Sequence, residues 1–189
     1  MNSPWTSLSL HTPARLACAL AVAGGVLAHP CRGLAGPVPL ARDGQPAAAV
    51  VLPAQPATQE QQAAGELVEH LRLISGAVLP VVAADAIPAG LTPVFLGTAA
   101  DAALDAAARA AGDNPSSFAL RVTPARIDIR GLSDEGTLFG VYELLEQLGV
   151  RWYAPGDLGR VLPAAPTAAV AVQETIQAPS MELRLLQPW

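Results

Sequence analysis

Near the middle of the chain the sequence reads Ser117-Phe-Ala-Leu-Arg-Val-Thr-Pro-Ala-Arg-Ile-Asp-Ile-Arg-Gly131. In its two halves, Ser117–Pro124 and Ala125–Gly131, the type of side chain alternates with a period of two residues. This is the side-chain period of a β-strand. In the second half Ile127 and Ile129 share one face, while Asp128 lies on the other. The short join between the halves predicts an antiparallel hairpin with one face in the core and one face in water.

A helix is predicted directly after this hairpin. Ser133 is typical of an N-cap residue, and Gly149 follows the last apolar position, Leu148. The side expected to be buried carries apolar residues at helical spacing, namely Leu138, Val141, Tyr142, Leu145 and Leu148.

A second long helix is predicted upstream, with Thr58 as its N-cap, Gln61 completing a capping box and Gly76 ending it. Its apolar face consists of Ala63, Ala64, Leu67, Val68, Leu71 and Ile74. Its polar face is expected to carry Glu60, Glu66, Glu69 and Arg72.

The remaining apolar segments complete an alternation of strands and helices. Further strands are predicted at Ala48–Pro53, Val78–Ala83, Pro93–Gly97, Val150–Tyr153, Leu158–Leu162 and Ala168–Gln173, and an alanine-rich helix at Ala99–Ala111. Pro80 cannot donate a hydrogen bond to a neighbour, which favours an edge strand. The order of elements predicts an α+β fold, with a mixed, largely antiparallel sheet and two main helices packed on one face. A doubly wound parallel sheet is the alternative.

The first 35 residues are typical of a secretory signal peptide. Arg15 supplies a positive charge, Leu16–Ala28 supplies a short apolar segment, and small residues offer cleavage after Ala28 or Ala35. The apolar segment is shorter than the roughly 20 residues of a membrane-spanning helix, although retention as an anchor is the alternative. We expect export to the periplasm or the extracellular space, with no stable membrane span after cleavage. Residues 36–47 are rich in Pro and Gly and are expected to be a linker.

The charge pattern argues against nucleic acid as a partner. All 11 positively charged residues are arginines scattered along the sequence, and the net charge is −5. A phosphate-binding surface needs concentrated positive charge, so we expect no nucleic-acid partner.

No residue pattern points to a metal site or to a nucleophile. His70 is the one histidine that certainly remains after processing, and a zinc site needs several ligands. We therefore expect His70 to be an exposed helix residue. A catalytic Ser or Cys needs a base within hydrogen-bond reach, and the sequence contains no GxSxG motif.

The turn Gly131-Leu-Ser-Asp-Glu-Gly136 follows a strand and opens a helix, as phosphate-binding turns do. However, it has neither GxGxxG spacing nor a lysine, and Asp134 and Glu135 would repel a phosphate. Adjacent carboxylates on a helix point about 100° apart, whereas glycoside hydrolysis needs two that flank one bond. We expect this pair to stabilise the helix N-terminus, and we predict no catalytic, cofactor or metal site.

Aromatic residues are scarce, yet Tyr142, Trp152 and Tyr153 lie within 12 positions of one another. An exposed Trp-Tyr pair can stack on a sugar ring or can fill a contact between domains. Arg151, Trp152 and Tyr153 are therefore the candidate residues for a domain interface or for sugar stacking, with the interface favoured.

The segment Leu148-Gly-Val-Arg-Trp-Tyr153 with Pro155-Gly156 resembles the accessory N-terminal domain of family 67 α-glucuronidases. It is also similar to the second domain of bacterial β-N-acetylhexosaminidases and their uncharacterised relatives. Four further stretches share the likeness, namely Ala64–Pro80, Phe95–Gly97, Ile127–Gly131 with Gly136, and Ala178–Arg184, which is similar to the link into a catalytic barrel.

The resemblance implies a hexosaminidase domain-2-like fold over residues 48–176, with a linker to a barrel beginning at 177–189. In these families the catalytic carboxylates lie in the barrel, so none is placed in this sequence, and the chain alone is expected to be inactive. The hypothesis is a non-catalytic N-terminal domain of an exported glycoside hydrolase of α-glucuronidase or β-hexosaminidase type, truncated before the barrel. Its partner would be a catalytic (β/α) barrel domain or subunit, in cis or in trans. The alternative is a stand-alone exported carbohydrate-binding module whose partner is an oligosaccharide.

Overall fold

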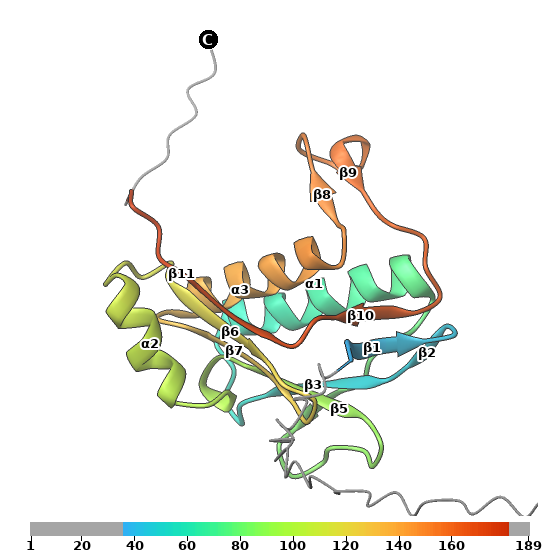
Figure 1. Ribbon diagram of the computed structural model, residues 1–189, viewed down its shortest axis with the longest axis horizontal. Coiled ribbons are helices and arrows are strands. Elements are labelled where there is room, and N and C mark those ends of the chain that lie inside the picture. The colour runs from blue at the N-terminus through green and yellow to red at the C-terminus, as the bar shows by residue number, and fades with distance from the viewer. Residues whose placement is uncertain (1–35, 182–189) are drawn as a thin grey trace, which may run out of the picture. The chain divides into compact units, whose positions relative to one another are not determined.

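The computed structural model describes residues 36–181, and its centre is a mixed six-stranded sheet (Figure 1). The strands in order across the sheet are β11 (Gln173–Gln177), β6 (Phe118–Val122), β7 (Ile127–Gly131), β5 (Thr92–Leu96), β3 (Ala48–Leu52) and β4 (Val81–Ala83). Neighbours from β7 to β4 run parallel, and every other strand pairing in residues 36–181 is antiparallel. The predicted α+β class, with mixed and largely antiparallel sheets, is confirmed. The expected signal peptide, residues 1–35, lies outside the described residues, as do residues 182–189 of the expected linker.

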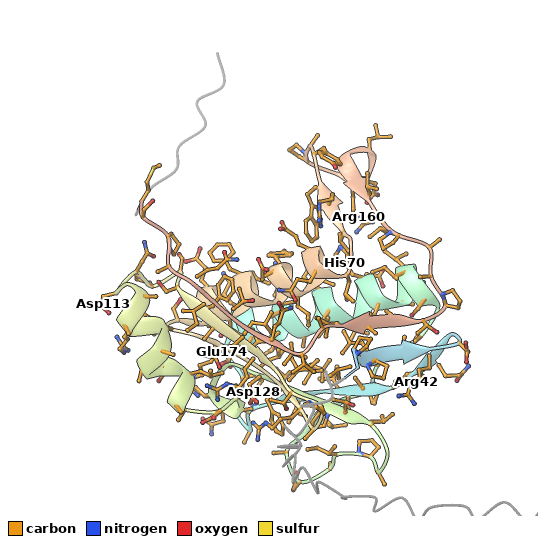
Figure 2. All side chains as sticks on the ribbon, viewed as in Figure 1. Arg42, His70, Asp113, Asp128, Arg160 and Glu174 are labelled. Carbon is orange, nitrogen blue, oxygen red and sulfur yellow. The ribbon has the colours of Figure 1, made fainter. Side chains whose placement is uncertain are left out.

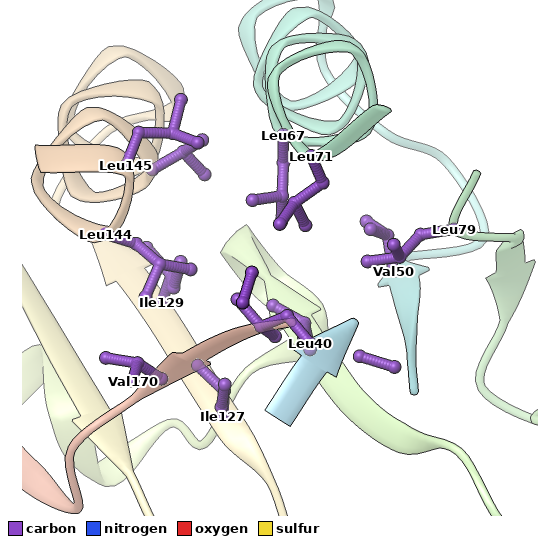
Figure 3. Close-up of a cluster of buried hydrophobic side chains, with 14 of the residues drawn as sticks. Leu40, Val50, Leu67, Leu71, Leu79, Ile127, Ile129, Leu144, Leu145 and Val170 are labelled. Carbon is purple, nitrogen blue, oxygen red and sulfur yellow. The ribbon is translucent and has the colours of Figure 1, made fainter. Parts of the chain in front are cut away.

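Two long helices cover one face of this sheet, α1 (Thr58–Ser75) and α3 (Asp134–Gln147). Figure 3 shows their buried leucines meeting the strand residues of the core, here Leu67, Leu71, Leu144 and Leu145 against Leu40, Ile127 and Ile129. A shorter helix, α2 (Ala103–Ala111), lies on the opposite face, where Leu104 and Ala108 pack on Ala119. The prediction of two main helices on one face is therefore correct.

The β6–β7 hairpin is antiparallel as predicted, but its second face is only partly in water. Asp128 is buried, where it accepts hydrogen bonds from the Arg126 guanidinium and from the Asp101 backbone N–H at 3.0 Å. Arg130 is held by Asp105 of α2, with 2.7 Å between Nε and Oδ1. The expectation of a wet face was wrong for Asp128 and Arg130, because Asp101 and Asp105, just before and within α2, bind them, whereas Arg126 stays 40% exposed.

Residues 36–47 were expected to be a linker, but they contain two strands, β1 (Val38–Arg42) and β2 (Gln45–Pro46). With β10 (Ala168–Val170) these strands form a small antiparallel sheet, and Leu40 is fully buried in the main core. Asp43 and Gly44 both have positive φ and make the turn between β1 and β2. The linker prediction was wrong because these turn-forming residues join two strands.

The start of α1 also differs from the prediction. The N-cap is Ala57 rather than Thr58, and Glu60, expected on the polar face, is buried. The Glu60 carboxylate accepts the Ala57 N–H at 2.9 Å and the Thr98 N–H at 3.1 Å. Gly97 opens the short helix η1 (Gly97–Ala99) with φ 57°, and a Cβ there would lie 1.7 Å from Glu60 Oε1. Glu60 is thus buried because its charge satisfies backbone donors from two segments.

Two further predictions, the end of the first long helix at Gly76 and an edge strand at Pro80, are confirmed. Gly76 ends α1 in the left-handed conformation, with φ 83°, and its N–H donates to the Arg72 carbonyl. The strand that follows Pro80, β4, is an edge strand.

None of the helices within residues 36–181 is long and apolar enough to cross a membrane.

Candidate docking surface

A small hairpin stands on the outer side of α1 and α3 (Figure 1). It consists of β8 (Arg151–Trp152), the short helix η2 (Asp157–Gly159) and β9 (Arg160–Val161). Gly149, with φ 98°, turns the chain out of α3. Arg151 Nη1 donates to the carbonyl oxygens of Glu146 and Val150, each at 2.6 Å. Because the Glu146 carbonyl lies in the last turn of α3, at its negative end, Arg151 acts as a C-terminal cap that holds the base of the hairpin.

Trp152 connects the hairpin to both long helices. Its ring meets His70 of α1 with 5.5 Å between centroids and Tyr142 of α3 with 5.3 Å, both in edge-to-face arrangements. Such pairs contribute about 0.5–1.5 kcal/mol each beyond the area that they bury. Trp152 nevertheless stays 36% exposed. Of the predicted aromatic residues, the structure therefore brings Tyr142 and Trp152 into contact.

His70 was expected to be an exposed helix residue, but only 2% of it is accessible. Its Nδ1 lies 2.8 Å from the Glu66 carbonyl oxygen, and its Nε2 has no hydrogen-bond partner among the described residues. Figure 2 shows His70 on α1, below the hairpin that carries Arg160. The prediction was wrong because the sequence pattern of α1 contains no information about the hairpin, some 80 residues later in the chain, that covers His70.

In residues 36–181, no three His, Cys, Asp or Glu side chains are grouped in a way that could hold a metal ion.

The tip of the hairpin exposes apolar side chains to solvent. We call Trp152, Tyr153, Leu158 and Val161 the hairpin patch; Tyr153 is 77% exposed and Leu158 is fully exposed. The Tyr153 N–H donates to the Gly159 carbonyl at 2.8 Å, which fixes the loop that displays them. These exposed apolar side chains make the hairpin patch the candidate docking surface.

A groove of about 720 Å³ runs along the outer side of α3. It is lined by residues of α3, of the start of β6 and the residue pair before it, and of the end of β11 with the segment that follows: Ser116, Phe118, Glu135, Phe139, Tyr142, Glu143, Glu146, Gln177, Ala178, Pro179, Ser180 and Met181. A second recess of about 330 Å³, lined by Tyr142, Glu146 and Trp152, joins this α3 groove to the hairpin patch.

Tyr142 was predicted on the buried side of α3, whereas it is half-buried and lines the α3 groove. Sequence reasoning did not identify Phe139, Glu143 or Glu146 as surface candidates. Their spacing of three and four residues indicates that they share one helix face. The spacing alone does not predict a groove, because the sequence does not show that β11 ends beside this face.

The α3 groove is negatively charged. The Glu143 carboxylate accepts hydrogen bonds from Gln147 Nε2 at 2.9 Å and from Gln177 Nε2 at 2.6 Å, which hold it in place. Glu135 and Glu146 are exposed, and neither forms an ion pair within the described part of the chain. Burial raises the pKa of the Tyr142 phenol above its ordinary value, and the nearby Glu66 carboxylate raises it further.

The turn from Gly131 to Gly136 is occupied by its own chain. A Cβ on Gly131 would lie 2.2 Å from the Thr137 nitrogen, and one on Gly136 would lie 2.6 Å from the Ser117 carbonyl oxygen. Ser133 caps α3 by accepting the Gly136 N–H at 3.1 Å, as predicted. Asp134 and Glu135 lie in the first turn of the helix. Here the glycines allow close packing of strand, turn and helix.

No protein-family model and no curated protein sequence matches the chain. Among solved structures, it is similar to the family GH115 4-O-methyl-α-glucuronidase BtGH115A, described as specific for decorated arabinogalactans, with 19% identity and a TM-score of 0.56. That match covers 77% of this chain and 19% of the enzyme. The GH20 β-N-acetylhexosaminidase of Streptomyces coelicolor A3(2) matches with 18% identity and a TM-score of 0.48, over 77% of this chain and 24% of the enzyme. The N-acetyl-β-hexosaminidase of Streptomyces plicatus matches with 20% identity and a TM-score of 0.45, also over 77% of this chain and 24% of the enzyme. The chain thus has the fold of a segment of the GH115 enzyme and spans about a fifth of its length.

Proposed function

We propose that this chain is a non-catalytic domain of an exported glycoside hydrolase, of α-glucuronidase or β-hexosaminidase type, and that it docks on a catalytic (β/α) barrel in cis or in trans. The observation that carries the proposal is the hairpin patch, in which Tyr153 and Leu158 present apolar surface on a hairpin anchored to both long helices. Aromatic side chains such as Tyr153 are enriched in the centre of protein interfaces, and that centre is more apolar than its rim.

The fold comparison supports the same proposal. The matching region is a minor part of the GH115 enzyme, as expected for a domain that accompanies a larger catalytic unit. The inference to a hydrolase rests on this likeness of fold, and the inference to docking rests on the patch.

The anchoring of the hairpin suits a docking role. Trp152 is clamped between His70 and Tyr142, and Arg151 ties the hairpin to the end of α3. A loop that is ordered before it binds loses less conformational entropy on association. Tyr153 and Leu158 would therefore meet the barrel as a preformed contact.

The test is a binding measurement with the full chain and the barrel encoded in the same transcript or operon. We expect the double variant Tyr153→Ser with Leu158→Ser to weaken binding by at least tenfold. The matched control is Val78→Ser with Val81→Ser, which removes exposed apolar side chains beside the β4 edge and should leave binding unchanged. Equal binding by the patch variant and the wild type would overturn the proposal.

A second measurement separates docking from the carbohydrate-binding alternative. The full chain is titrated with xylan-derived and amino-sugar oligosaccharides, and no saturable binding is expected. Millimolar or tighter binding that disappears on Trp152→Ala would instead identify a carbohydrate-binding module.

A further inference from the structure

We propose that the docking partner places arginine side chains in the α3 groove. This inference rests on the proposed function, because it names the chemistry of the partner surface that meets α3 beside the hairpin patch. It is carried by a different set of residues, namely Phe139, Tyr142, Glu143 and Glu146 on α3.

The α3 groove is lined by acidic side chains. Glu135, Glu143 and Glu146 all line it, and within residues 36–181 none of its twelve lining residues is Arg, Lys or His. Arg151, at the base of the hairpin, has its guanidinium hydrogen-bonded to the Glu146 and Val150 carbonyl oxygens. A partner that covers three carboxylates without supplying positive charge would have to remove them from water unpaired, which is costly. The occupant is therefore cationic.

Two aromatic side chains of α3 also line the groove. Phe139 is 38% exposed and Tyr142 is half-buried, and on the helix they alternate with the glutamates at spacings of three and four residues. A planar guanidinium stacks on an aromatic ring and also donates two parallel hydrogen bonds to a carboxylate. An ammonium group offers only the point charge. The combination of rings and carboxylates in one groove favours arginine over lysine.

The Glu143 carboxylate is held in one position by two glutamine side chains. Gln147 and Gln177 both donate to its carboxylate, one from α3 and one from β11. The carboxylate is thus held on the groove wall before a partner arrives, which lowers the entropic cost of pairing. The same negative charge disfavours a uronic acid or another acidic sugar in this groove, because like charges repel.

The experiment uses the full-length chain and a display library of random dodecapeptides as the probe. Peptides that bind the wild type are counter-selected against the isosteric double variant Glu143→Gln with Glu146→Gln. Arginine is expected to be enriched in the retained peptides, next to an apolar residue. A synthetic copy of the strongest peptide should bind the wild type at least tenfold more tightly than the variant, and at least tenfold more tightly than its own arginine-to-citrulline form.

The matched control is Asp85→Asn with Asp113→Asn, which makes the same change of net charge at exposed sites outside the groove. It should bind the peptide as the wild type does, and circular dichroism of both double variants should match that of the wild type. Retained peptides without a cationic residue, or equal binding to the groove variant, would overturn the inference. A lysine form that binds as well as the arginine form would also overturn it.

Barrel binding distinguishes this inference from the proposed function. If the barrel binds and depends on Tyr153 and Leu158 but not on Glu143 and Glu146, the arginine inference fails alone. If the barrel does not bind the wild-type chain, the proposed function fails.

Discussion

The imidazole of His70 and the indole of Trp152 lie 5.5 Å apart between ring centroids, with an angle of 66° between their planes. This contact joins the middle of α1 to the β8–β9 hairpin. It buries the histidine, and it fixes the base of the hairpin whose tip carries Tyr153 and Leu158. The stability of this contact therefore decides whether the hairpin patch is held in one position.

Replacement of His70 tests this contact. His70→Ala removes the ring under Trp152 and leaves a cavity, so we expect a loss of about 2 kcal/mol in the free energy of unfolding. His70→Phe keeps an aromatic partner and removes the unpartnered Nε2, so its stability should stay within about 1 kcal/mol of the wild type. Denaturant unfolding measures both variants. An alanine variant as stable as the wild type would show that the contact contributes nothing.

The buried carboxylate of Glu60 gives a second prediction. Glu60→Ala leaves the Ala57 and Thr98 N–H groups without their acceptor, which is expected to cost about 1–3 kcal/mol. Thermal unfolding provides the measurement. The control is Glu69→Ala, an exposed position on the same helix, where a change below about 0.5 kcal/mol is expected. Equal effects at the two positions would contradict the role assigned to Glu60.

Two helical glycines should respond in opposite directions to alanine. At Gly140 a Cβ would lie 2.5 Å from Ile129 Cγ2, so Gly140→Ala should lower the free energy of unfolding by about 1–3 kcal/mol. At Gly65 no neighbouring atom lies within 4 Å of the place that a Cβ would take, so Gly65→Ala should raise it by up to about 1 kcal/mol. The same denaturation experiment measures both. A stabilised Gly140→Ala variant would mean that α3 is not in close contact with β7.

The Glu69–Arg72 pair gives a prediction about pH. The hydrogen bond from Arg72 lowers the pKa of the Glu69 carboxyl below its ordinary value of 4.5. A carboxyl with a lowered pKa in the folded state stabilises that state above its unfolded pKa, and the contribution disappears as the pH falls through the folded pKa. In Arg72→Gln the Glu69 pKa should rise toward 4.5, as measured by NMR titration of the side-chain carboxyl. An unchanged pKa in this variant would refute the pairing in solution.

Local patterns in the sequence were sufficient for several elements of the fold. The alternation in Ser117–Gly131 predicted the hairpin, and Ser133 and Gly76 were correctly identified at helix ends. These features depend on backbone geometry and on hydrogen bonds between residues close in sequence, so a short window contains the information. The likeness of the chain to part of a glycoside hydrolase was also accessible from the order of its motifs, at the level of the fold.

The burial of particular polar residues was decided only by the tertiary structure. Glu60, His70 and Asp128 were assigned to polar or exposed positions, and all three are buried under segments that lie far away in the sequence. Each is covered by a segment that also supplies a donor or an aromatic contact. The α3 groove arises in the same way, because Phe139 and Glu143 line a groove only where the chain after β11 returns to α3. Periodicity reports which face of a helix or strand is apolar, but contact between distant segments determines what covers the other face.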